Sequence, residues 1–141
     1  MIIGTGIDIV HIPRIERAAR RFGKRFLTRA FCPGEIDCCT GKRIPWPCLA
    51  GRFAAKEALV KALGTGFRHG IALTDICVNR LDNGRPKIVL SGNALEYARR
   101  LGVTALHVSI SHEKSDAIAM VILEGDAGAE PCSCPGQPVG S

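Results

Sequence analysis

The chain has 141 residues, of which 46% are hydrophobic and 23% are charged, the composition of one globular domain that can bury a core. No apolar run reaches the roughly 20 residues of a membrane helix, and the opening segment lacks the basic stretch of a secretion signal, so we expect a cytoplasmic protein with no membrane partner. The formal net charge of +6 indicates an acidic partner.

The first third of the chain predicts a strand followed by helices. Residues 2–10 combine isoleucines with small residues, a pattern typical of a strand. Pro13 suits the first turn of a helix, and apolar residues then recur at helical spacing as far as Gly23, which interrupts the pattern. Residues 26–39 show no clear period, although Pro33 can begin a short helix there.

The rest of the chain alternates helices with strands. A long helix is predicted over residues 48–63, followed by a hairpin over 76–90 that turns through an Asn-Gly pair. Ser91 can cap the next helix, which ends before Gly102. Two strands follow, and their alternating or continuous apolar residues place them at 106–110 and 117–123.

These elements predict an α+β fold in which a mostly antiparallel sheet packs against the long helix. We place the folded domain at residues 1–124. Residues 125–141 consist mainly of Gly, Pro, Ser and Cys with almost no apolar anchor, so we expect a disordered tail.

Seven cysteines are many for this length, but an odd number cannot pair fully within one chain, and nothing in the sequence indicates secretion. Their spacings do not form the two ligand pairs of a zinc site. We therefore expect thiols, with Cys48 and Cys77 filling the core or partly buried, and we favour no redox role for the adjacent Cys38 and Cys39.

The positive charge is concentrated in residues 11–29, where seven basic residues accompany Glu16 alone, while the 12 basic and 12 acidic residues elsewhere cancel. Like charges at this density repel one another, which favours a docking surface for an acidic protein over a solvated helix face. Nucleic acid is the rival partner, but only two aromatic residues are available for stacking and no nucleic-acid motif is present. The expected docking residues are Arg14, Arg17, Arg20, Arg21, Lys24 and Arg25.

A carboxylate and an amine lie one helical turn apart, at Glu57 and Lys61, on a helix rich in Ala, Leu and Val. Such a pair is usually a solvated surface pair. Here a second acid, Asp8, ends the opening strand, and Arg52 precedes the pair on the same helix. Two acids with a lysine and an arginine are what Mg²⁺ and a polyphosphate require, because the cation takes carboxylate oxygens and the phosphates take cationic donors.

Three ordered segments carry a family resemblance. They are Gly6-Ile7-Asp8-Ile9, Arg52-Phe53-Ala54-Ala55-Lys56-Glu57-Ala58 continuing to Lys61, and Ser109-Ile110-Ser111-His112. Each is weak alone, but their order and spacing together resemble the 4′-phosphopantetheinyl transferases, most closely the short bacterial type with a single copy of the fold. The resemblance covers about residues 1–124, and residues 50–66 are its most specific part.

This resemblance implies an enzyme that moves 4′-phosphopantetheine from coenzyme A to a serine of apo acyl carrier protein, with Mg²⁺, and releases adenosine 3′,5′-bisphosphate. Asp8 and Glu57 match the metal ligands of the family, and Lys61 matches a lysine that faces the pyrophosphate. These three are the expected catalytic residues. The base that takes the serine proton stays open between the two carboxylates and a metal-bound hydroxide.

The resemblance also predicts the contacts to coenzyme A. Arg52 and His112 match positions near its phosphates, although a histidine that merely ends a strand is an equally weighted alternative for His112. A glycine-rich segment after the long helix would let the backbone approach the nucleotide, and the hairpin turn matches a loop near the adenine. Lys56 is expected to be solvated or structural. The full expected contact set is Arg52, Lys61, Gly64, Thr65, Gly66, Arg85, Pro86 and His112.

The resemblance also implies a homotrimer, because the short type that the chain resembles is trimeric. Longer members of the superfamily carry two copies of the fold with the site at their junction, so a single copy is expected to complete its site with a neighbouring subunit. An open sheet with apolar strands at both ends, at 2–9 and 117–123, has surface to bury in such an assembly. The alternative to the enzyme is a non-enzymatic basic module that binds an acidic protein or nucleic acid. Asp8 and Glu57 favour the enzyme over this alternative, because a pure binding module has no use for convergent acids.

Overall fold

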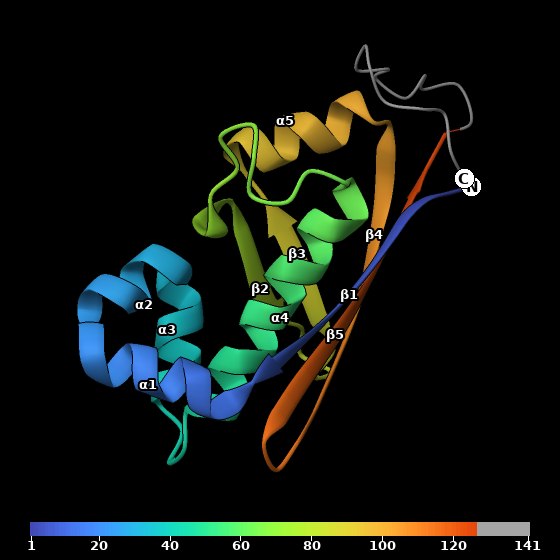
Figure 1. Cartoon of the computed structure of the whole chain (residues 1–141). Helices are drawn as coiled ribbons and strands as arrows, with labels where there is room; N and C mark the ends of the chain where they lie inside the picture. The colour runs from blue at the N-terminus through green and yellow to red at the C-terminus, as the bar shows by residue number, and fades with distance from the viewer. Residues whose placement is uncertain (127–141) are drawn as a thin grey trace.

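A computed structural model describes residues 1–126 and confirms the predicted α+β class (Figure 1). Its helices and strands follow the predicted order, with two helices that were not predicted, one that begins directly after Gly23 and a short one before the hairpin. They are β1 (Ile2–His11), α1 (Ile12–Phe22), α2 (Lys24–Ala30), α3 (Pro33–Thr40), α4 (Trp46–Leu63), the short 3₁₀ helix η1 (Leu73–Asp75), β2 (Ile76–Arg80), β3 (Pro86–Leu90), α5 (Gly92–Arg100), β4 (Val103–Glu113) and β5 (Asp116–Gly125).

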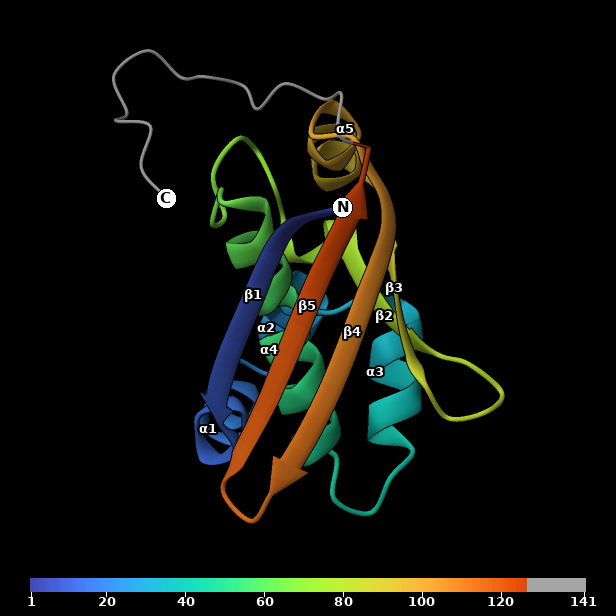
Figure 2. The ribbon, with the colours of Figure 1, turned by 90° about the vertical axis from the view of Figure 1, so that its right-hand side faces the viewer.

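The main sheet is antiparallel, in the order β1-β5-β4, and β2 pairs with β3 in a separate hairpin. The strand expected at 117–123 is therefore the centre of the sheet, not one of its ends. The reason lies in its side chains, since both faces of β5 are apolar: Ala119 and Val121 point inward, and Ile118 and Met120 point outward. Figure 2 shows the three strands from the side that no helix covers, with α4 behind them.

Helix α4 packs against the inner face of the sheet and is buried along almost its whole length. Two glycines of β1 permit the close approach. A Cβ atom at Gly6 would lie 1.9 Å from the carbonyl oxygen of Ala58, and one at Gly4 would meet that of Ala62. The helix ends at Gly64, whose φ of 80° only glycine adopts readily, as predicted.

A buried ion pair ties the smaller helices to α4. Lys56 Nζ donates to Glu35 Oε1 at 2.6 Å and to the carbonyl oxygens of Ala30 and Leu73 at 2.8 and 3.1 Å. Glu35 in turn accepts the backbone N–H of Val78 at 3.1 Å. Burial lowers the pKa of Lys56, against the opposing attraction of Glu35. Of the two expectations for this lysine, the structural one is confirmed.

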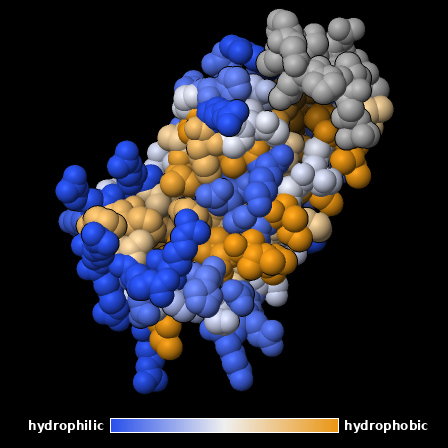
Figure 3. Space-filling model, in the orientation of Figure 1, coloured by the Kyte–Doolittle hydropathy of each residue, from blue (hydrophilic) through white to orange (hydrophobic). Residues whose placement is uncertain are grey.

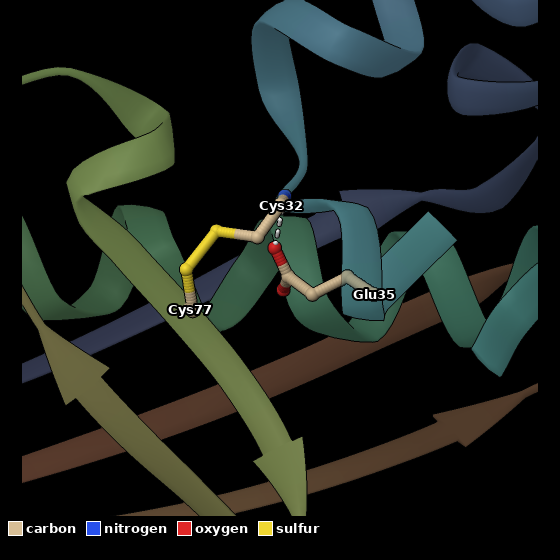
Figure 4. Close-up of side chains that lie close together, drawn as sticks. All are labelled: Cys32, Glu35 and Cys77. Carbon is tan, nitrogen blue, oxygen red and sulfur yellow. Dashed lines mark hydrogen bonds between the residues drawn. A yellow bond between two sulfur atoms is a disulfide. The ribbon is translucent and has the colours of Figure 1, made fainter. Parts of the chain in front are cut away.

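The expectation of thiols at Cys48 and Cys77 is wrong. Cys32 is bonded to Cys77, as Figure 4 shows, and Cys39 is bonded to Cys48. Sequence spacing could not reveal these pairs, because the packing of α3 against β2 and α4 brings their Cα atoms to 5.9 and 5.5 Å.

Glu35 lies beside the Cys32–Cys77 disulfide, and its Oε1 accepts the backbone N–H of Cys32 at 2.8 Å (Figure 4). The three side chains are close enough to surround a cation. Both sulfurs are used in the disulfide, however, and both carboxylate oxygens of Glu35 already accept hydrogen bonds. This cluster therefore does not qualify as a metal site.

Smaller differences concern the ends of the elements. Ser91 precedes α5 but makes no side-chain cap, because its hydroxyl donates to the carbonyl oxygen of Asp75 at 3.4 Å. Strand β5 extends to Gly125, whose N–H donates to the carbonyl oxygen of Met1 at 2.9 Å. The expected tail lies, apart from its first two residues, outside the described residues. No helix within residues 1–126 is long and apolar enough to cross a membrane.

Candidate active site

Three of the predicted residues meet where β1 crosses α4. Asp8 follows Gly4 and Gly6 on the face of β1 that packs against the helix. Lys61, in the last turn of α4, donates from Nζ to Asp8 Oδ1 at 2.9 Å and to the carbonyl oxygen of Ile7 at 3.1 Å. Glu57 lies one turn earlier on the same side of the helix and is partly buried. The structure thus groups the expected catalytic residues.

The charges of this group favour a bound cation. Burial raises the pKa of Glu57, and the nearby Asp8 raises it further, while Lys61 and Arg14 act in the opposite direction. The hydrogen bond from Asp8 raises the pKa of Lys61 and keeps its amine charged. Two carboxylates that repel each other beside one exposed lysine have capacity for a further positive charge, and their hard oxygen atoms fit Mg²⁺.

A cavity of about 390 Å³ lies at the other edge of the sheet, between α4, the hairpin β2–β3 and β4. Its lining includes Arg52, Pro86 and His112, three of the predicted coenzyme A contacts. Arg85, also predicted, is exposed at the hairpin turn and does not line the cavity.

Two further basic residues that sequence reasoning did not single out, Lys42 and Arg80, also line the cavity. Lys42 belongs to a loop between helices, and Arg80 ends β2, so neither shares a motif with the other site residues. Their positive charge was the only feature of the sequence that could have indicated a role in this cavity. Together with Arg52 they give the cavity a positive lining that suits phosphate groups.

One chain does not bring the acid–lysine group and the cavity together. Lys61 follows Arg52 by nine residues, which is two and a half turns, so the two side chains leave α4 on opposite sides. The sheet also separates the acid–lysine group from the cavity. Asp8 is on edge strand β1 and His112 is on edge strand β4, with β5 between these strands. The chain therefore carries the acid–lysine group and the cavity as two separate groups of predicted site residues.

The glycine-rich segment lies just beyond Lys61, at the C-terminal end of α4. Gly64 and Gly66 both have positive φ, of 80° and 58°, and both are exposed. Thr65 between them is buried and donates its hydroxyl to the carbonyl oxygen of Gly66 at 2.7 Å. This backbone borders the acid–lysine group rather than the cavity.

The predicted docking surface is exposed. The apolar residues Ile12, Ile15 and Ala19 of α1 face the core, which leaves the basic residues outside. Figure 3 shows hydrophilic side chains projecting from the end of the molecule where α1 and α2 lie. The guanidinium of Arg20 lies 5.6 Å from the ring centre of Trp46. The exposed set comprises Arg14, Arg17, Arg20, Arg21, Lys24 and Arg25.

The fold and these sites agree with a family assignment. A family model described as the 4′-phosphopantetheinyl transferase superfamily matches residues 4–121. The match covers most of the chain, so the chain belongs to this superfamily, and the prediction of an enzyme is confirmed.

Within the superfamily, the similar proteins are holo-[acyl-carrier-protein] synthases. That of Maridesulfovibrio salexigens is 48% identical over 124 residues, which are 88% of this chain and 99% of the relative. The crystal structure of the Neisseria meningitidis synthase has a TM-score of 0.81 at 34% identity and covers 88% of this chain and 99% of its own. The Helicobacter pylori synthase, in complex with coenzyme A, has a TM-score of 0.75 at 38% identity, covering 85% and 99%.

Proposed function

We propose that this protein transfers 4′-phosphopantetheine from coenzyme A to a serine of apo acyl carrier protein, depends on Mg²⁺, and releases adenosine 3′,5′-bisphosphate. The observation that carries the proposal is the grouping of Asp8, Glu57 and Lys61 where β1 crosses α4. The similar Helicobacter pylori protein was crystallised with coenzyme A, which supports the same co-substrate here. A cytoplasmic location remains a prediction.

Asp8 and Glu57 would hold the Mg²⁺ ion, because their carboxylates converge without a hydrogen-bond donor between them other than the exposed Lys61. When bound, the ion would neutralise negative charge that develops on the pyrophosphate during transfer. The remaining contributions come from side chains of the protein.

Lys61 is the cation that we infer faces the leaving phosphate. Its amine is exposed and charged, and the pairing with Asp8 is a surface contact that a phosphate oxygen can replace. Glu57 is the carboxylate that we infer takes the serine proton, directly or through a water, because it is partly buried beside the site and Lys61 donates its hydrogen bond to Asp8 instead. Arg52 and His112 would bind further phosphate oxygens from the cavity.

The separation of the acid–lysine group from the cavity supports a shared active site in a homotrimer. If Asp8, Glu57 and Lys61 of one subunit face the cavity of its neighbour, one coenzyme A molecule can contact both groups. The uncovered face of the sheet offers the necessary surface, since Ile7, Ile9 and Met120 are 54%, 65% and 44% exposed on it (Figure 2). Light scattering that gives a monomer mass for a fully active sample would refute this arrangement.

The basic surface on α1 and α2 supports the choice of acceptor. An acyl carrier protein is acidic, so its negative helix would be attracted to the exposed arginines of α1, the helix that directly follows β1, the strand of Asp8. A nucleic acid would be attracted as well, but the surface carries only Phe22 as an exposed aromatic residue.

The test is mass spectrometry of an apo acyl carrier protein incubated with this protein, coenzyme A and Mg²⁺. We expect a gain of one phosphopantetheine on the carrier, the nucleotide product in solution, and loss of both on addition of a chelator. The folded double variant Asp8→Asn, Glu57→Gln should give neither product. Transfer by that variant at the wild-type rate would remove the proposed roles of both carboxylates.

A further inference from the structure

A second group of reactive side chains lies at the rim of the cavity, and the proposed transfer does not use it. Cys39, near the end of α3, is bonded to Cys48 in the first turn of α4. Cys48 lines the cavity, whereas Cys39 is fully buried. Cys38, adjacent to Cys39, is exposed and carries a free thiol. Three cysteines therefore meet at one edge of a ligand-sized cavity.

The guanidinium of Arg52 connects these sulfurs to the cavity. Its Nη1 donates to Cys48 Sγ at 2.9 Å, and its Nη2 donates to Cys38 Sγ at 3.4 Å. Its Nε donates to the carbonyl oxygen of Val78 at 3.3 Å. Among the salt bridges of residues 1–126, none involves Arg52. Two sulfurs and backbone oxygens thus orient a cation that remains available for a ligand's phosphate.

The disulfide also fixes a loop that contributes to the cavity. The loop between α3 and α4 contains Lys42 and Ile44, both of which line the cavity. The N–H of Lys42 donates to the carbonyl oxygen of Cys39 at 3.1 Å, but no backbone hydrogen bond from Arg43 or Ile44 is formed. The covalent link between Cys39 and Cys48, which joins the two helices at the ends of this loop, therefore adds a restraint where the middle of the loop has no backbone hydrogen bond of its own.

We propose that Cys38, Cys39 and Cys48 form a redox site that controls ligand binding in the cavity. The closed Cys39–Cys48 disulfide holds Arg52 and Lys42 in position, and reduction releases them. The ligand is assumed to be coenzyme A, and in that respect the inference rests on the proposed function.

The reducing partner is a dithiol. One of its thiolates attacks the Sγ of Cys48, the residue of the pair that lines the cavity. The Cys39–Cys48 bond breaks, and Cys39 leaves as a thiolate that takes up a proton. The second thiol of the reagent then closes the reagent's own disulfide and releases Cys48 as a thiolate beside the Arg52 guanidinium. In total, two electrons pass from the dithiol to the cysteine pair, while Cys39 takes up one of the two thiol protons and the other is released to solvent.

Cys38 gives the opened site an alternative partner. Because Cys38 and Cys48 contact the same guanidinium, reoxidation by a small disulfide can join these two residues in place of the original pair. Such an exchange would move the bond from the buried to the exposed side of α3. The site therefore has one reduced and two oxidised forms, which differ in how the loop and Arg52 are held.

The test compares coenzyme A binding before and after treatment with dithiothreitol, by calorimetry without carrier protein. Labelling of Cys39 and Cys48 with iodoacetamide, followed by peptide mass spectrometry, establishes which form is present. We expect reduction to weaken binding roughly tenfold, the value of one well-placed charged contact. Cys48→Ser should bind weakly in both conditions. Cys77→Ser is the matched control, because it removes the other disulfide, whose sulfurs do not line the cavity, and should respond as the wild type does.

Hydrogen exchange of residues 41–45 separates the two proposals. If oxidised wild-type protein does not bind coenzyme A, the proposed function loses its co-substrate, and the redox site is then judged by exchange alone. Faster exchange on reduction would support the release of the loop. Unchanged exchange, or unchanged coenzyme A affinity in unlabelled protein whose Cys39 and Cys48 are both found reduced when an aliquot is unfolded and labelled, would overturn the redox site.

Discussion

Replacing Gly6 by alanine tests whether close packing of β1 on α4 positions the active site. A Cβ atom there would lie 1.9 Å from the carbonyl oxygen of Ala58, and real Cβ atoms essentially never approach another atom within 3.0 Å. The strand must therefore retreat by at least the difference, about 1 Å. Because Asp8 lies two residues farther along β1, its 2.9 Å contact with Lys61 should break.

The expected cost follows from that displacement. Overpacking of a close contact costs about 1–3 kcal/mol, and for a domain of this size each kcal/mol lowers Tm by roughly 3–5 °C. We therefore expect Tm to fall by about 3–15 °C in differential scanning calorimetry. Misplacing a catalytic group by about 1 Å can reduce the rate by a factor of about 100, which should appear in kcat/KM for transfer.

Gly34→Ala is the matched control. Gly34 is in α3, its φ is not positive, and no atom lies within 4 Å of a Cβ added there. Alanine should stabilise the protein by up to about 1 kcal/mol and leave transfer unchanged. Wild-type Tm and full activity in Gly6→Ala would refute the close packing. A destabilised but fully active variant would instead refute the link between this packing and the position of Asp8.

Three further predictions use the charged groups. Lys56→Met should destabilise the protein by about 3–5 kcal/mol in urea unfolding, because it leaves Glu35 buried without its partner; a double variant with Glu35→Gln that is no more stable than Lys56→Met would contradict this. The raised pKa of Glu57 means that the folded state binds its proton more tightly than the unfolded state, so metal-free stability should fall as pH rises from about 4.5 through the raised pKa. Glu57→Gln should remove that fall, and the same slope in both proteins would exclude Glu57 as its source. Arg21→Glu should raise KM for the carrier without changing coenzyme A affinity, and the wild-type KM should rise with salt; an equal effect from Arg99→Glu, on α5 at the opposite end of the molecule (Figure 1), would show that the basic surface on α1 is not the docking site.

Local sequence signals were sufficient where a glycine or an apolar period fixed an element. Gly64 and Gly102 follow their helices with φ of 80° and 81°, as their positions predicted. The place of β5 at the centre of the sheet was beyond such signals, because strand order depends on which strands pair after the chain has turned. The two disulfides and the Lys56–Glu35 pair join residues that are brought together only by packing.

The candidate site was predicted in composition but not in arrangement. Asp8, Glu57 and Lys61 meet as expected, whereas Arg52 and His112 lie at the opposite edge of the sheet. The separation of Arg52 from Lys61 could have been predicted from helical geometry, since a spacing of nine residues places them on opposite sides of one helix. The position of His112 could not be predicted in this way, because it depends on the order of the strands in the sheet.

The central position of β5 has a consequence for biosynthesis. Ile2 pairs with Glu124, so within residues 1–126 the first strand of the domain to be synthesised has its sheet partner in the last one. At about 5–20 residues per second, β1 waits roughly 6–25 s for that partner. During this interval its isoleucines and unpaired backbone groups are open to other chains. The sheet therefore cannot close before β5 has emerged, and nascent chains that stop before β5 should be substrates for chaperones.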